Sequence, residues 1–204
     1  IVWLMSVLWR RYYSVDMSSA LDERERQALA EVLRALGFGE LRVRPLFRSR
    51  ALWARLERPQ LNLEIELCDG AWRDYTRLHC SFTRPLNQGL QLLCEEGAGA
   101  MGWVLSFHEV ELEDEELDER FILLARDDER LAELLQSPLR QELVRLRDMV
   151  EDFQLTDQGL FLFVSYVARD RALRDLVKAA LYLCDDLIRW AQERGPIGPL
   201  QTGQ

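Results

Sequence analysis

The chain has 204 residues, of which 48% are hydrophobic and 30% charged; this composition excludes global disorder and suits one domain or two small ones. The formal net charge of −9 would repel a phosphate backbone, so we expect no general nucleic-acid binding. No two of the four cysteines have the close spacing of a metal site or redox motif. Their apolar surroundings predict buried free thiols in a reducing compartment.

The N-terminal residues 1–16 differ from the rest of the chain. The apolar run Ile1–Trp9 is too short to span a bilayer, which requires about twenty residues. Three interpretations remain open: the end of a transmembrane helix, a short element that packs on the domain, or sequence upstream of a natural start at Met17. Under the first, the residues next to the membrane would be Trp3, Arg10, Arg11, Tyr12 and Tyr13.

The spacing of apolar residues predicts a helix over Ser19–Gly37, where they recur at i, i+3, i+4 and i+7. Strict alternation then predicts strands at Leu61–Leu67 and near Leu78–Phe82. Two further strands are expected near Leu41–Phe47 and Ala51–Leu56. Together these strands predict an antiparallel meander with one solvent-facing side.

A strand is also expected within Trp103–Leu112. The second half is then predicted to fold as a strand, two helices, a hairpin and a closing helix: Phe121–Ala125, a helix capped by Asp127, a helix with Pro138 in its first turn, Phe153–Val167 and a long helix capped by Asp170. We therefore expect an α+β fold packed as one domain over residues 17–194. The Gly- and Pro-rich residues 195–204 should form a flexible tail.

The sequence contains no recognisable catalytic or metal-binding pattern. The two histidines, His79 and His108, lack a second ligand at a metal-like spacing. The acidic run Glu109–Glu119 has no glycine of the kind that a Ca²⁺ loop requires, so it is expected to be a solvated loop or strand edge. We assign no catalytic, cofactor-binding or metal-binding residue and expect no cofactor.

Four arginines, Arg42, Arg44, Arg48 and Arg50, have the same parity in the sequence and would share a face in one unbroken strand. Pro45 argues against an unbroken strand. Two interpretations remain open: a solvated sheet face that balances the acidic run, or a patch for an anionic partner or for lipid headgroups.

The segment from Val110 to about Ile188 contains, in order, "VELEDEELDERFILLARDD", "LAELLQSPLRQELVRL", "FQLTDQGLFLFV" and "LRDLVKAALYLCDDL". This segment resembles a family of uncharacterised bacterial proteins, many of them membrane-anchored ahead of a cytoplasmic domain. The resemblance implies a shared architecture and a cytoplasmic location, with the inner face of a membrane as a further hypothesis. It brings no catalytic residues.

The polar side chains are therefore expected to be distributed over a solvated surface and not to be grouped in a reactive site. We expect a non-enzymatic domain that acts through contact with a protein partner, with a position beside a membrane as an added hypothesis. The alternative is a small-ligand binder or an enzyme whose site is assembled across the sheet. A deep, closed pocket in which His79 or His108 faces acidic residues would favour that alternative.

Overall fold

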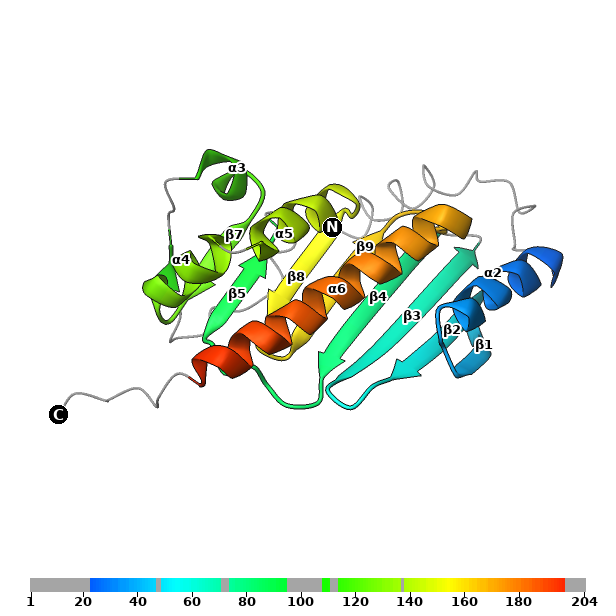
Figure 1. Cartoon of the computed structure of the whole chain (residues 1–204). Helices are drawn as coiled ribbons and strands as arrows, with labels where there is room; N and C mark the ends of the chain where they lie inside the picture. The colour runs from blue at the N-terminus through cyan, green and yellow to red at the C-terminus, as the bar shows by residue number, and fades with distance from the viewer. Residues whose placement is uncertain are drawn as a thin grey trace, which may run out of the picture.

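The computed structural model describes residues 23–46, 49–70, 74–94, 108–110, 114–136 and 138–196. In this part of the chain there are five helices: α2 (Glu23–Ala35), α3 (Glu115–Asp118), α4 (Asp128–Gln136), α5 (Leu139–Asp148) and α6 (Asp170–Arg194). The strands are β1 (Glu40–Leu46), β2 (Ser49–Glu57), β3 (Leu61–Gly70), β4 (Tyr75–Phe82), β5 (Leu90–Leu93), β6 (His108–Glu109), β7 (Ile122–Ala125), β8 (Asp152–Thr156) and β9 (Gly159–Val164). This α+β arrangement confirms the predicted fold class (Figure 1).

The described strands form one nine-stranded sheet in the order β1-β2-β3-β4-β9-β8-β5-β7-β6, and all neighbours are antiparallel. The first four strands form the predicted meander. The β8–β9 hairpin then inserts between β4 and β5, so that strands from both halves of the chain share one sheet. Of the strand expected within Trp103–Leu112, the described part is β6.

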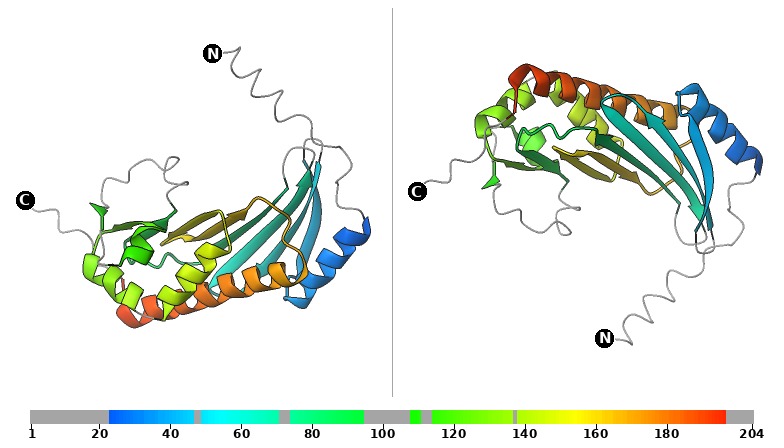
Figure 2. Two further views of the ribbon diagram at one scale, coloured as in Figure 1. Left: turned by 90° about the horizontal axis from the view of Figure 1, so that it is seen from above. Right: turned by 90° about the horizontal axis from the view of Figure 1, so that it is seen from below.

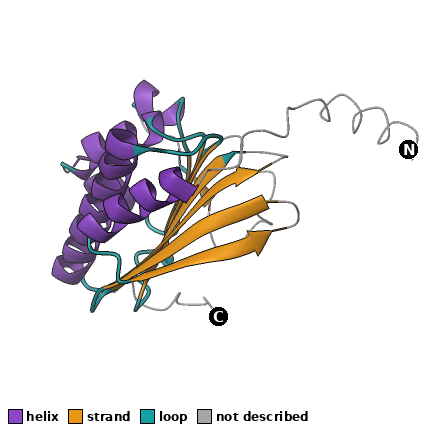
Figure 3. Cartoon of the chain, turned by 90° about the vertical axis from the view of Figure 1, so that its right-hand side faces the viewer, coloured by secondary structure: helices purple, strands orange, loops and turns teal. Residues whose placement is uncertain are grey.

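The described helices gather on one side of the sheet, and none of them covers its other side (Figures 2 and 3). Helix α6 lies along this layer, in contact with β4, β9, α2 and α5. Its apolar stripe predicts this position, because a 25-residue helix with one long buried face requires a broad surface to cover. Among the described residues, no helix combines the length and hydropathy that a membrane-spanning segment requires.

The hydrophobic core lies between the helices and the sheet. In β3 the alternate residues Leu61, Leu63, Ile65 and Leu67 are all at most 1% exposed and face this layer. Strand β4 contributes the same alternation, in which Leu78 and Cys80 are buried while Arg77 and His79 are exposed. The period of two that predicts these strands therefore also separates the core from the outer face. All four cysteines are buried, as expected.

The junction of β4 and β9 depends on Gly159. A Cβ atom at this position would lie 2.0 Å from the backbone oxygen of Cys80, so no larger residue fits without moving the backbone. The preceding turn residue, Asp157, accepts hydrogen bonds at 2.9 Å from the backbone N–H groups of Gln88 and Gly89. The β8–β9 turn thus also holds the connection that leads into β5.

Candidate functional site

The structure places the sequence-predicted residues in different regions. Five of them, Trp3, Arg10, Arg11, Tyr12 and Tyr13, lie outside the described residues, and so does Arg48.

Arg42 and Arg44 lie in β1, and Arg50 lies in β2. The chain turns between these strands, and Arg50 pairs in register with Pro45, whereas Arg44 pairs with Ala51. Arg50 is therefore out of phase with the two arginines of β1.

Arg42 and Arg44 lie on the side of the sheet that faces away from the helices. Directly opposed residues in an antiparallel sheet point to the same side, so the register defines rows of side chains across β1–β4. Two rows cross this surface: Arg42, Trp53, Glu66 and Arg77, and beside it Glu40, Arg55, Glu64 and His79. We call this surface of β1–β4 the open face.

At the centre of the open face lies Trp53, which is only 4% exposed. The guanidinium carbon of Arg44 lies 4.1 Å from the centroid of its ring, and that of Arg42 lies 5.9 Å away. Arg42 also forms an ion pair with Glu40. Within the described residues Arg44 forms no ion pair, so its N–H groups remain available although the cation lies over an aromatic ring.

The neighbouring carboxylate of Glu66 is 6% exposed and fully engaged. The hydroxyl of Tyr75 donates a 2.7 Å hydrogen bond to it, and Arg77 forms an ion pair with it. Burial, followed by the hydrogen bond to Glu66, raises the pKa of Tyr75, so the phenol remains a proton donor at neutral pH. This arrangement positions the side chains rather than preparing them for proton transfer.

A cleft of about 190 Å³ opens on this surface, lined by Arg44, Trp53, Glu64, Ile65, Glu66, Arg77, His79 and Phe161. Sites for small molecules usually measure about 300–1,000 Å³, so this cleft suits one side chain better than a substrate. His79 is exposed, and its Nδ1 lies 3.5 Å from the hydroxyl oxygen of Ser81. That distance exceeds the 2.6–3.2 Å or so expected of a nucleophile–base pair.

A larger cleft of about 530 Å³ lies where α6 ends, beside the loop after β4. Its lining includes Pro59, Pro85, Asn87 and Ile188, and its single charged lining residue among the described ones is Arg84. No acid–base pair meets there. In the described ranges, no three His, Cys, Asp or Glu side chains gather closely enough to hold a metal ion.

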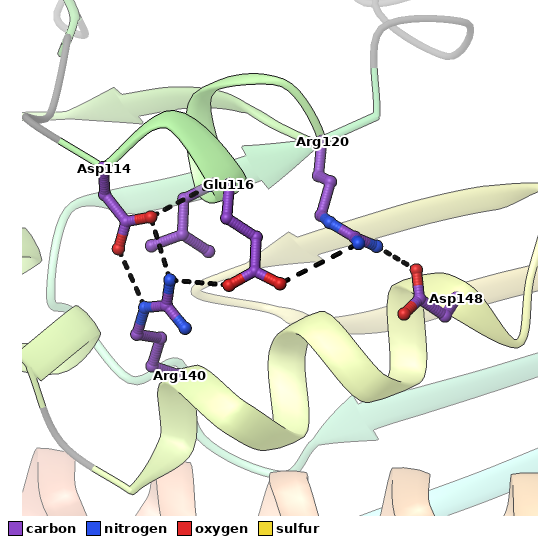
Figure 4. Close-up of polar contacts among 6 residues, drawn as sticks. Asp114, Glu116, Arg120, Arg140 and Asp148 are labelled. Atoms are coloured by element: carbon purple, nitrogen blue, oxygen red, sulfur yellow. Dashed lines mark hydrogen bonds and ion pairs between the residues drawn. The ribbon is translucent and has the colours of Figure 1, made fainter.

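Among the described residues, the most extensive ion-pair network joins α3 to α5 (Figure 4). Arg140 reaches both carboxylate oxygens of Asp114 at 2.8 Å and one oxygen of Glu116 at 2.8 Å. Arg120 pairs with Glu116 at 3.8 Å and with Asp148. Part of the acidic run that was expected to be a solvated loop or strand edge is thus a short helix held by arginines.

Asp114 has two roles in this network. Its carboxylate accepts a hydrogen bond from the backbone N–H of Leu117, which caps α3. The hydrogen bond from Arg140 is the main cause of its lowered pKa. The carboxylates of this network stabilise α3, and they are already paired with arginines instead of being free to bind a ligand.

The chain matches no known family model, no curated protein and no solved structure. The resemblance noted over residues 110–188 therefore remains a prediction. The main feature that sequence reasoning missed is the contact of Arg44 with Trp53. Only the position of the β1–β2 turn reveals it, because that turn sets which residues oppose one another.

Proposed function

We propose that this chain is a non-enzymatic domain that acts through protein–protein contact, with the open face as its contact surface. The observation that carries the proposal is the position of the Arg44 guanidinium. Its carbon lies 4.1 Å from the ring centroid of the buried Trp53, and the group has no carboxylate partner among the described residues. An arginine in this position combines a flat apolar surface with N–H donors that match a carboxylate.

Arginine is also among the residues most enriched where protein contacts are strongest. The adjacent cleft, at about 190 Å³, has the size of a side chain. Glu66 and Arg77 are already paired, so they provide a rigid surround and not a reactive group. These features support recognition of a protein surface.

The alternative is a small-ligand binder or an enzyme. It would require a site where groups able to exchange protons meet in a space closed to water. In the described residues the smaller cleft is open to solvent, with an exposed His79 opposite Glu64. The larger cleft has Arg84 as its single charged lining residue, and a further open cleft of about 500 Å³ is lined by Glu116, Arg140 and Asp148, which are already in ion pairs. Defined turnover of any small molecule would favour the alternative over our proposal.

A position beside a membrane is a separate proposal, which comes from the apolar run Ile1–Trp9 and from the family resemblance. Flotation with liposomes that contain anionic lipids, comparing the full chain with a version lacking residues 1–16, tests it. We expect only the full chain to float. Equal flotation of the two would remove the N-terminal segment from the proposal.

The contact surface can be tested by quantitative affinity capture from the organism's own extract. The variant Arg44→Glu reverses the charge at the open face, and Lys178→Glu reverses an exposed charge on α6 as a matched control. We expect Arg44→Glu to lose at least about 90% of a stoichiometric partner and Lys178→Glu to retain it. Loss with Lys178→Glu alone would place the contact surface on the helical side.

A further inference from the structure

The free edge of the sheet at β1 adds a second feature to the open face. Within the described residues β1 pairs with β2 alone, so one row of its backbone N–H and C=O groups has no strand partner. Pro45 lies near the end of this strand. The stretch Glu40–Arg44 is therefore a continuous backbone edge with every N–H present.

The side chains beside this edge alternate in kind. Arg42 and Arg44 lie on the open face, whereas Val43 points to the helical side, as its register partner Leu52 does. Val43 is 51% exposed and is one of three large hydrophobic residues so exposed in the described part of the chain. A strand placed beside β1 would thus meet cations on one side and an apolar surface on the other.

Charges and proline on an edge strand can also serve to prevent pairing with other chains. Two observations favour recognition over protection. A purely protective cation needs no fixed position, whereas the exposed guanidinium of Arg44 is held over the ring of Trp53. An apolar, half-exposed Val43 between the two arginines would weaken such protection.

We infer that an extended segment of a partner protein adds to β1 as a further strand, with acidic side chains opposite Arg42 and Arg44 and an apolar side chain beside Val43. The backbone hydrogen bonds would provide affinity, and the alternating side chains would provide specificity. The inference rests on the proposed function and names the chemistry of the partner.

The overall charge of −9 does not oppose this docking strongly. At physiological ionic strength charges are screened beyond about 8 Å, so an acidic strand at β1 interacts chiefly with the nearby arginines. Arg42 already shares its charge with Glu40, which makes Arg44 the main anchor. The carboxylate opposite Arg44 should therefore matter more than the one opposite Arg42.

The test uses the full chain and a fluorescent peptide of about ten residues with Glu-Ile-Glu at its centre, flanked by threonines. Two control peptides carry Lys-Ile-Lys at the centre or backbone N-methyl groups on two successive central residues. Anisotropy should show that both controls bind at least about tenfold more weakly than the acidic peptide. The double variant Arg42→Glu/Arg44→Glu should prefer the Lys-Ile-Lys peptide, which would also show that this variant is folded.

Three results would overturn the inference. Equal binding of the N-methylated peptide would indicate charge contact without strand pairing, while the proposed function would stand. Binding of none of the peptides would reject the acidic strand, and the capture experiment would then decide the proposed function separately. A dimer in sedimentation velocity that Val43→Lys abolishes would identify the occupant of this edge as a second copy of the chain.

Discussion

In the α3–α5 network the guanidinium of Arg140 makes three contacts of 2.8 Å with carboxylate oxygens, and α3 depends on them. On the open face the guanidinium of Arg44 lies over an indole ring and, within the described residues, meets no carboxylate. Both side chains are cations on a protein with a net negative charge. They differ in whether a carboxylate among the described residues already occupies the guanidinium group.

This difference distinguishes a charge that holds the fold from one that remains available to a partner. Removing a carboxylate partner of Arg140 should loosen a local element, whereas replacing Arg44 should leave the fold nearly unchanged and affect binding. Variants in each region, and at the β4–β9 junction of the sheet, test the contrast.

The largest effect is expected from Gly159→Ala. The added Cβ would meet the backbone oxygen of Cys80, so β4 and β9 must separate and the open face would lose its support from the second half of the chain. We expect a loss of at least about 3 kcal/mol in the free energy of unfolding, measured by urea denaturation. Gly39→Ala, where an added Cβ would meet nothing within 4 Å, is the matched control. Equal stability of the two variants would contradict the β4–β9 geometry.

Asp69 should give the next largest effect, and one that depends on pH. It is 5% exposed at the end of β3, and burial followed by the charge of Asp74 raises its pKa from 3.8 to about 6. Because the folded pKa lies above the unfolded one, the stability it contributes is complete below pH 3.8 and is lost as pH rises through about 6.

Asp69→Asn removes this ionisation while keeping the size of the side chain. At about pH 7.5 we expect it to be more stable than the parent by on the order of 2 kcal/mol, and the gain should vanish near pH 4. Chemical denaturation across that range measures it, with the exposed Glu129→Gln as control. A gain of the same size at both pH values would indicate a cause other than titration.

In the α3–α5 network, Asp114→Ala removes both the N-cap of α3 and the main partner of Arg140. We expect a loss of about 1 kcal/mol near neutral pH, because both contacts are partly exposed. The pKa of Asp114 is shifted down, whereas that of Asp69 is shifted up. The stability that Asp114 contributes is therefore present above its unfolded pKa, and the loss caused by Asp114→Ala should diminish as pH falls below about 4. Faster amide hydrogen exchange confined to α3 and its neighbours would locate the effect, and unchanged exchange there would contradict it.

The smallest effect on stability is expected from Arg44→Ala. Only its contact with the ring of Trp53 is lost within the described residues, which amounts to about 0.5 kcal/mol for an exposed side chain. Binding of the acidic peptide should nevertheless fall at least about tenfold. A loss of stability as large as that of Asp114→Ala, with binding unchanged, would assign Arg44 to the fold instead.

Much of this architecture can be predicted from the sequence, because local periodicity determines it. The stripe of α6 and the alternation of Leu61, Leu63 and Ile65 identify the buried faces directly. The order of strands is a different matter. The insertion of the β8–β9 hairpin between β4 and β5 depends on contacts far apart in the chain, such as that of Gly159 with Cys80.

The candidate site is harder to predict for a related reason. The four arginines of one parity suggest a single patch, but the turn between β1 and β2 places Arg50 out of phase with Arg44. The same turn brings Trp53, nine positions away in the sequence, beneath Arg44. A shift of register by one residue would reverse both results, so composition alone cannot reveal this surface.

The claim that the open face is the contact surface can be tested most directly by site-specific photo-crosslinking in the native cells. Arg42 on β1 and Arg189 on α6 form a matched pair, because their side chains are 66% and 67% exposed and each is paired with a nearby carboxylate. A photoreactive residue at position 42 should yield a discrete protein adduct that position 189 does not. Adducts from position 189 alone would place the contact on the helical side and contradict the account.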